Sequence, residues 1–542
     1  MKLTELQIRK SFFLIEKCPF LDHAKHRQEL FLVLEHTHDL TNEGESMKQT
    51  IFSPECEEYG KEVDRLIDKE DYDGLIKYLI QIEEFSSTHC ATEYAPIFYY
   101  LGTANSALAN HFQKTGGAEQ DVVRYRKQAL FYQRQALSFL ERIDKHETLL
   151  LLIYTNYAND LDACGRVIEA LRIYRKAISI NPSFGMAIGN YGRALTFYAN
   201  TVNDPGHRSN LHRYAYQAMK HALETPDPNM HEQAVLYFRN MVGAYEGTLG
   251  KDRLSEPISF VEYDLGDQTE QEYREWCLKK HLFLNPLNDL IITESSFAHD
   301  PLIITQYTEF DDRDEVTTRS SGEPPKWFSM LNQLKEEYVY SRFLCYEGSE
   351  KSRVLHYADK EVKLSLSSFD YVNYSIRLEQ IKSAFKNLFS IFDQIGFVIN
   401  EFWRLGFSER DADASRVFKC DKYPKDNVAL KALYWSYCEF SEKFGNASSA
   451  SERDLKTLRN ALEHKFVKVH EYRSYEKLQI EEDSFYHISE DELVKYTLRL
   501  LELAREWILE LVYAIGLEVR KNERGAGTVQ LHILDFDDEW KL

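Results

Sequence analysis

The sequence predicts an all-α protein in which a solenoid of helical repeats is followed by a helical bundle. Two observations support this fold class: paired helix patterns recur in the N-terminal half, and long amphipathic helix patterns follow residue 330. The 542 residues are 43% hydrophobic and 13% aromatic, which is enough for several packed cores. We expect an N-terminal helical segment at 1–59, the solenoid at 60–250, an irregular connector at 251–330, the bundle at 331–522 and a C-terminal tail at 523–542.

Composition excludes several classes of protein. No window reaches the roughly 18 uninterrupted apolar residues of a membrane span, and Glu16 and Lys17 break the apolar run SFFLI near the N-terminus. The eight cysteines are scattered without a CxxC pair, so neither a disulfide framework nor a zinc site is expected. We therefore expect a cytoplasmic protein with no membrane segment, no cofactor and no metal.

The central part of the solenoid resembles a tetratricopeptide repeat. When Pro182 is aligned with the last proline of a unit of about 34 residues, aromatic, small and large apolar residues occupy the positions that the pattern reserves for them. These residues are Tyr154, Tyr157, Ala158, Leu161, Ala170, Tyr174 and Ala177. The alanines let two antiparallel helices approach closely, and stacking of several such units buries their faces.

Looser copies of this spacing flank the central unit on both sides. They contain insertions at 112–124, around Gly116 and Gly117, and at 201–212, around the sequence NDPGHRSN, and we expect both insertions to form loops. Residues 63–85 and 232–245 have the pattern of flanking helices.

The connector has short apolar runs with prolines, WCLKKHLFLNPLNDL at 276–290 and AHDPL at 298–302. An acidic stretch, EFDDRDE, and the sequence SSGEPP then predict a mobile linker. His281 and His299 could be metal ligands, but no third ligand accompanies them at metal spacing, so we favour a packed, capped connector.

The bundle is predicted from helices at 328–347, 374–405 and 430–444, followed by two helices with capping boxes. The helix at 374–405 has a continuous apolar stripe, formed by Leu378, Ile381, Phe385, Leu388, Phe392, Ile395, Ile399 and Phe402. A box at Ser451 and Asp454 opens a helix that we expect to run to about Val469. After a tyrosine-rich loop, a box at Ser489 and Glu492 opens the last helix, to about Arg520.

The sequence RNALEH, Arg459 to His464, lies in the first of these capped helices. It combines groups that can cleave an RNA phosphodiester without a metal. The arginine can hold a phosphate through two parallel hydrogen bonds, and a histidine can transfer protons near neutral pH because its unperturbed pKa is about 6.5.

Helical geometry separates the two groups. On a helix that continues to Val469, Asn460, His464 and Lys468 lie opposite an apolar stripe of Leu455, Leu458, Leu462, Phe466 and Val469. Arg459 lies about 140° from His464, where it can pair with Glu463. For Arg459 and His464 to meet, the helix must distort, the arginine must reach round the helix, or a second copy of the bundle must supply the missing group.

The net charge of −21 argues against general coating of nucleic acid. Residues 451–480, however, contain seven basic and five acidic side chains, and we expect Lys468, Lys465 and Arg453 to contact RNA there. An ordinary solvated helix face of mixed charge explains the same residues equally well. Tyr472 and Tyr475 could stack on unpaired bases, although packing is the more usual role of such tyrosines.

A helical bundle with an arginine, a polar residue directly after it and a histidine after four intervening positions, here Arg459, Asn460 and His464, resembles the HEPN superfamily of ribonucleases. The resemblance is in particular to a bacterial branch fused to tetratricopeptide repeats. The resemblance spans about residues 270–520 and includes HLFLNPLNDL, AHDPL and EEYVYSRFLCYEG. It implies that Arg459 and His464 are catalytic, that Asn460 orients His464 or the substrate, and that two domains pair around one cleft. It also implies metal-independent cleavage that leaves a 2′,3′-cyclic phosphate.

We therefore expect a metal-independent endoribonuclease of a toxin or antiviral defence type, a homodimer through its C-terminal bundle. The solenoid would sense a protein or ligand trigger in its concave groove. The alternative is a non-catalytic adaptor, in which the solenoid binds a protein partner and the bundle only dimerises.

Overall fold

The computed structural model describes residues 54–86, 94–140, 146–225, 227, 230–304, 306–308, 325–350, 356–361, 372–408, 410–440, 450–471, 484–522 and 528–530. These residues form two compact units. Unit 1 comprises Met1–Ala199, Ser209–Pro257 and Glu442–Ser449, and unit 2 comprises Asn200–Arg208, Ile258–Ser441 and Ala450–Leu542. The two units are described separately.

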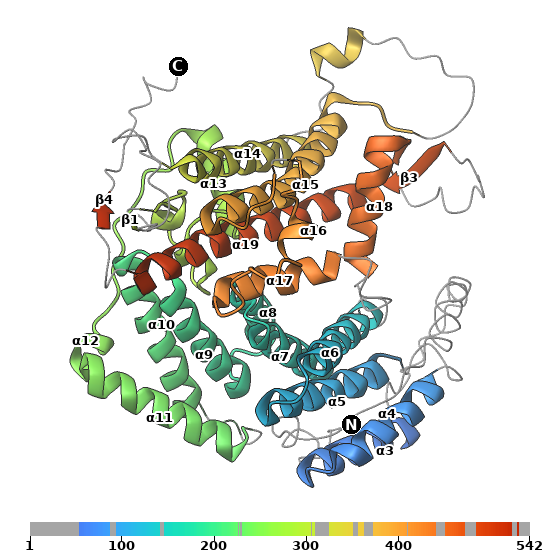
Figure 1. Cartoon of the computed structure of the whole chain (residues 1–542), viewed down its shortest axis with the longest axis vertical. Helices are drawn as coiled ribbons and strands as arrows, with labels where there is room; N and C mark the ends of the chain where they lie inside the picture. Colours follow the sequence, from blue (N-terminus) through green and yellow to red (C-terminus); the bar gives the residue numbers. More distant parts are fainter. Residues whose placement is uncertain are drawn as a thin grey trace. The chain divides into compact units, whose positions relative to one another are not determined.

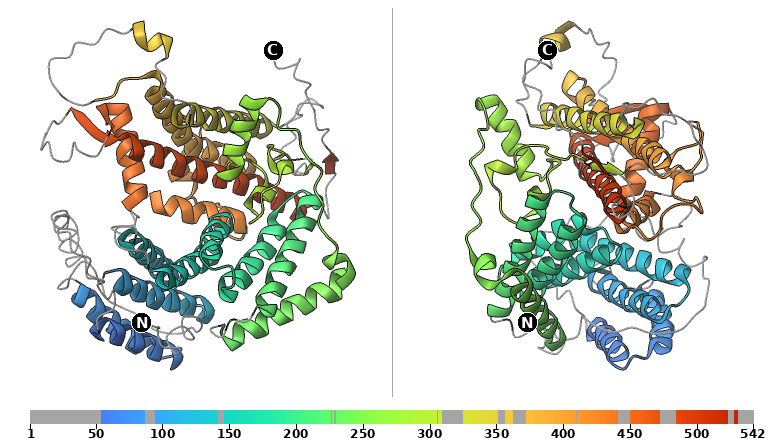
Figure 2. Two further views of the ribbon diagram at one scale, coloured as in Figure 1. Left: turned by 180° about the vertical axis from the view of Figure 1, so that it is seen from behind. Right: turned by 60° about the vertical axis from the view of Figure 1, so that its left-hand side comes forward.

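Unit 1 consists of helices joined by short turns, so that successive helices run antiparallel (Figures 1 and 2). The helices are α3 (Pro54–Asp68), α4 (Tyr72–Ser86), α5 (Tyr94–Thr115), α6 (Glu119–Leu140), α7 (Glu147–Ala163), α8 (Val167–Ile180), α9 (Gly185–Thr201), α10 (Pro205–Glu224), α11 (Glu232–Leu249) and α12 (Lys251–Ser255). The predicted helical solenoid is therefore present.

The residues that suggested the repeat hold α7 and α8 together. Ala158, Ala170 and Ala177 are fully buried, and Tyr174 fills the space between the helices and donates to Asn159 at 2.5 Å. In the next pair, a β-carbon on Gly192 of α9 would lie 2.8 Å from the carbonyl oxygen of Ala215 in α10. Small residues thus set the close approach of paired helices.

The expectation that both insertions form loops is wrong for most of their residues. Helix α5 continues to Thr115 and α6 begins at Glu119, so only a short turn separates them. Helix α10 likewise begins at Pro205, inside the sequence NDPGHRSN. Proline is well tolerated in the first turn of a helix, because its missing N–H has no partner there, so the insertion starts a helix.

Unit 2 is a helical bundle with two small sheets. Its helices are α13 (Gln268–Lys279), α14 (Lys326–Ser349), α15 (Ile376–Trp403), α16 (Ala414–Val417), α17 (Val428–Phe440), α18 (Ala450–His464) and α19 (Glu490–Asn522), with 3₁₀ turns η3 (Pro286–Asp289), η4 (Ser295–Phe297) and η5 (Tyr357–Glu361). Strand β1 (Gln306–Thr308) pairs antiparallel with β4 (Thr528–Gln530), and β2 (Phe466–His470) pairs parallel with β3 (Phe485–Ser489).

The core of unit 2 forms where α15, α17 and α19 meet. The predicted stripe of α15 is buried along its whole length. Trp507 of α19 is 2% exposed, donates to the Ser436 hydroxyl at 2.7 Å and packs edge-on against Phe392 and Phe418. The capping box that opens α19 is also present, because Ser489 and Glu492 exchange side-chain to backbone hydrogen bonds.

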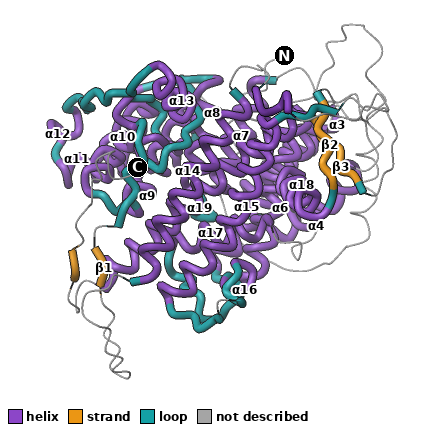
Figure 3. Tube along the Cα trace, turned by 90° about the horizontal axis from the view of Figure 1, so that it is seen from above, coloured by secondary structure: helices purple, strands orange, loops and turns teal. Residues whose placement is uncertain are grey.

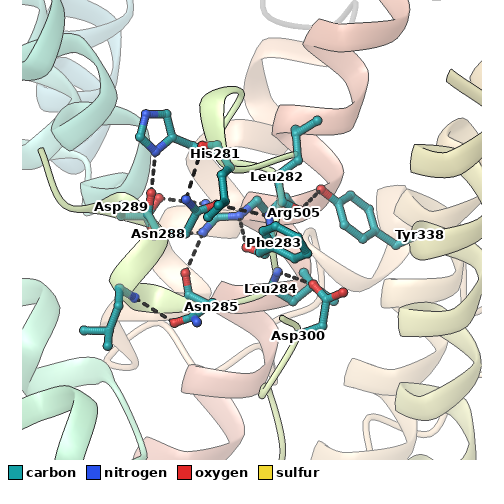
Figure 4. Close-up of polar contacts among 12 residues, drawn as sticks. His281, Leu282, Phe283, Leu284, Asn285, Asn288, Asp289, Asp300, Tyr338 and Arg505 are labelled. Atoms are coloured by element: carbon teal, nitrogen blue, oxygen red, sulfur yellow. Dashed lines mark hydrogen bonds and ion pairs between the residues drawn. The ribbon is translucent and has the colours of Figure 1, made fainter. Parts of the chain in front are cut away.

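The irregular segment 281–300 is clamped into the bundle by two buried arginines, of which Figure 4 shows Arg505. Arg505 of α19 binds the Asp289 carboxylate at 2.7 and 3.1 Å and donates to the carbonyl oxygens of Phe283 and Asn285. Arg342 of α14 binds Asp300 at 2.8 and 3.0 Å. We call these two ion pairs the arginine clamps. Both arginines also donate to backbone carbonyl oxygens of this segment, which have no partners in an α-helix or sheet.

The two connector histidines have packing contacts in the structure. His281 shares a short hydrogen bond with the carbonyl oxygen of Asn288, and its backbone is left-handed, with φ of 54°. His299 stacks on Tyr263 at 5.4 Å, and desolvation lowers its pKa. Most of the predicted linker, 309–324, lies outside the described residues. Among the described helices, none is both long enough and apolar enough to cross a membrane.

Candidate functional site

The candidate site lies at the C-terminal end of α18. Leu455, Leu458 and Leu462 form the predicted apolar stripe, and all three are buried. The stripe packs α18 against its neighbours in the bundle and leaves the side chains between them nearer the surface. The amide of Lys465 still donates to the Ala461 carbonyl oxygen at 2.8 Å, after which the chain turns into β2.

The prediction that this helix runs to Val469 is wrong, since it ends at His464. The next residues, FVKVH, are rich in β-branched and aromatic residues, which favour strands, and they form β2. Lys468 therefore does not share a helix face with Asn460 and His464. Its Nζ lies 4.0 Å from the ring centre of Phe485, in the adjacent strand.

Arg459 is held by several contacts within the bundle. Its Nε donates to Glu463, one turn further along the helix, at 3.0 Å, and its Nη1 donates to the Asn460 Oδ1 at 3.2 Å. The guanidinium also lies 5.5 Å from the ring centre of Phe389 in α15. The pairing with Glu463 that helical spacing permits is thus formed, and the Asn460 amide contacts the arginine.

His464 is highly accessible, with 73% of its side chain exposed. Its Nε2 lies 3.6 Å from the Glu463 Oε2, whereas Arg459 contacts the other oxygen of the same carboxylate. Arg459 thus forms the pairing one turn along its own helix that its spacing permits. Within one protomer, therefore, the two groups meet through a carboxylate that stands between them.

Acidic groups surround Arg459 on the side of α15. Partial desolvation and the nearby Asp413 raise the pKa of Asp393, whereas Arg459 acts to lower it and Glu463 to raise it further. Carboxylates thus act on the guanidinium from α15, through Asp393, and from α18 itself, through Glu463. A phosphate that binds Arg459 must compete with these groups.

The strands β2 and β3 run beside α18, and both extend the site (Figures 1 and 3). Their register sets Phe466 opposite Phe485, with ring centres 5.7 Å apart. The prediction that Phe466 belongs to the buried stripe is wrong, because this side chain is 71% exposed, two residues after His464. The signal that could have identified these strands is their enrichment in aromatic and β-branched residues, in FVKVH and in FYHIS.

Only some of the remaining predicted RNA-contact residues belong to the described part of the chain. Lys465 is exposed directly after His464. Arg453 is part of α18, but its side chain lies outside the described atoms, and Tyr472 and Tyr475 lie outside the described residues. The basic side chains described next to His464 are therefore Lys465 and Lys468.

Comparison with known families matches residues 318–518 to the family model described as LA2681-like HEPN. Searches of curated proteins and of solved structures gave no match. The matched region includes α14 to α19 and the whole of the RNALEH motif, but not the helices of unit 1. The bundle that holds Arg459 and His464 is therefore similar to LA2681-like HEPN domains.

Proposed function

We propose that the protein is a metal-independent endoribonuclease of the toxin or antiviral defence type, whose active site contains Arg459, Asn460 and His464. The observation that carries this proposal is the match of residues 318–518 to an HEPN model around a motif whose histidine is exposed beside an arginine. HEPN domains are commonly ribonucleases, and these side chains have the chemistry that RNA cleavage requires.

In the proposed reaction the ribose 2′-hydroxyl attacks the adjacent phosphorus. The 2′-oxygen forms a bond to phosphorus while the bond to the 5′-oxygen breaks, leaving a 2′,3′-cyclic phosphate and a 5′-hydroxyl. His464 transfers a proton during this exchange, which typically contributes ~10²- to 10⁴-fold in rate. Arg459 stabilises the negative charge on the nonbridging oxygens, and Asn460 positions the arginine through the hydrogen bond between them.

The helical repeats of unit 1 are the proposed regulator. They resemble tetratricopeptide arrays in the residues that pair α7 with α8, and such arrays bind extended peptides or partner helices in a concave groove. In this proposal a protein or ligand trigger binds unit 1, and the bundle acts as a homodimer on RNA.

The contact between Arg459 and Glu463 favours a second candidate function. An arginine already paired along its own helix needs no substrate to explain it. The protein would then be a non-catalytic adaptor that binds a partner through unit 1 and dimerises through the bundle.

One experiment separates the two functions. Purified full-length protein is incubated with total RNA in EDTA, beside His464→Ala and the matched control His221→Ala, an exposed histidine of α10 in unit 1. The nuclease proposal expects the wild type and the control to cleave and His464→Ala to be inactive. Because the His464 side chain is largely exposed, circular dichroism should be unchanged. Equal cleavage by His464→Ala would place the active site elsewhere.

A further inference from the structure

One face of the small parallel sheet carries an aromatic surface next to the motif. Side chains alternate along a strand, so Phe466, Lys468 and His470 of β2 share a face with Phe485 and His487 of β3. The face changes along its length: His470 is buried against His487 at 2.9 Å, whereas Phe466 is 71% exposed. The accessible end of the face is thus the end next to His464.

The two phenylalanines and one lysine are held together there. The rings of Phe466 and Phe485 are 5.7 Å apart and tilted by 36°, and the Lys468 Nζ lies 4.0 Å from the Phe485 ring centre. The Phe466 amide donates to the Ser484 carbonyl oxygen at 3.1 Å, which fixes the strand start where α18 ends. A large apolar side chain is therefore presented to solvent on a fixed backbone.

We infer that Phe466, Phe485 and Lys468 form a stacking platform for an unpaired base of single-stranded RNA, next to His464. Bases stack on aromatic side chains, and lysines beside the rings attract the adjoining phosphates. This inference rests on the proposed function, because it assigns part of the substrate's binding site.

A second copy of the chain is the other occupant that an exposed phenylalanine could bind. Charge favours RNA. Lys468 lies against the aromatic surface, and the exposed Lys465 directly precedes Phe466 in the chain. A symmetric contact at this face would bring like charges together, whereas a phosphate backbone complements them.

The test measures binding apart from cleavage. In the His464→Ala background and in EDTA, fluorescence anisotropy follows binding of a labelled single-stranded RNA of mixed sequence, and of the same RNA as a duplex. Phe466→Ala should weaken single-strand binding about 5- to 100-fold, since base stacking on an aromatic ring contributes to that extent. Phe466→Trp should retain binding, and Phe466→Leu should lose it as alanine does.

Two controls accompany these variants. Tyr340→Ala removes an aromatic of α14 that is 55% exposed, and it should bind as the parent does. Duplex binding should change less than twofold in every variant, because paired bases do not offer their faces. In otherwise wild-type enzyme, Phe466→Ala should raise KM and leave kcat close to its original value.

Several results would overturn the platform. They are single-strand binding by Phe466→Ala within twofold of the parent, full retention by Phe466→Leu, or loss of the dimer by light scattering in Phe466→Ala. The last would identify the face as an interface between copies. If the wild type cleaves no RNA but single-strand binding still depends on Phe466, the nuclease proposal fails and the platform stands. If it cleaves and Phe466 makes no difference, the platform alone fails.

Discussion

At the scale of single residues, Glu463 is the group on which the candidate site depends. It contacts Arg459 and His464 through its two carboxylate oxygens, so Arg459 must exchange this partner for a phosphate when substrate binds. An exposed ion pair of this kind contributes at most about 1 kcal/mol, because water and salt screen it.

We expect Glu463→Gln to lower KM by up to about fivefold, because the competing carboxylate is removed. Steady-state cleavage of a labelled RNA in EDTA measures this change, and thermal unfolding should be almost unaffected. A loss of activity as large as in Arg459→Ala would instead mean that Glu463 holds the arginine in its working position.

Asp393 gives a prediction about pH. Its pKa is raised by desolvation and by Asp413, so the folded state keeps this proton at a pH where the unfolded chain has lost it. The stabilising effect is full below the unfolded pKa near 4 and is lost as pH rises through the folded pKa.

Asp393→Asn should therefore gain stability relative to the wild type as pH rises from about 4 to 7. The effect should be small because this side chain reaches solvent. Urea unfolding at both pH values measures it. A difference between variant and wild type that does not grow with pH would contradict the cause assigned to the shift.

At the scale of elements, sequence periodicity predicted the helices whose stripes are long and regular. The pattern of α15 is an example, and the capping box at Ser489 and Glu492 located the start of α19. The prediction for the motif helix failed at its end, because Phe466 and Val469 continue the 3.6-residue pattern although the segment FVKVH forms a strand. Five residues do not distinguish the two periods, and the partner strand lies beyond 470 in the sequence.

The same limit applies to the connector. Nothing local in HLFLNPLNDL indicates that Asp289 binds an arginine more than 200 residues away, at Arg505. The match to the HEPN model begins at residue 318, and both carboxylates of the arginine clamps lie before that boundary. The compact unit thus needs residues that precede the matched region.

Arg505→Met should destabilise the protein by about 3–5 kcal/mol, because it leaves the buried Asp289 carboxylate without its cation. Denaturant unfolding of the full chain measures this cost. The matched control is Arg416→Met, which removes an arginine that is 51% exposed and pairs with Asp411, and it should change stability by less than about 1 kcal/mol. Equal effects of the two variants would show that the clamp is not a main contributor to stability.

At the scale of the whole molecule, the main prediction is a dimer through the C-terminal bundle. In one protomer Arg459 and His464 meet only through Glu463, so a composite site would take the arginine from one copy and the histidine from the other. Light scattering should give at least the mass of a dimer for the active protein. An active monomer would remove the composite-site argument.

Mixing variants tests the same prediction by activity. Arg459→Ala and His464→Ala should each be inactive, yet an exchanged mixture should recover about a quarter of wild-type activity, since half of the dimers would have one complete site. If both groups must come from one protomer, the mixture stays inactive. Native mass spectrometry of the mixture, in which the two variants differ in mass, checks that subunits have exchanged.

The arginine clamps also determine how segment 281–300 unfolds locally and exchanges its amide hydrogens with solvent. The amide of Leu284 donates to Asp300 at 2.6 Å and that of Phe283 to the Asn288 side chain at 3.2 Å. Arg342 holds the Asp300 carboxylate, and the Asn288 side chain is itself held by the carbonyl oxygen of Leu278. The segment therefore cannot fray as a surface loop does. Deuterium should therefore enter these non-helical amides as slowly as it enters the middle of α19, in a single cooperative opening of the bundle.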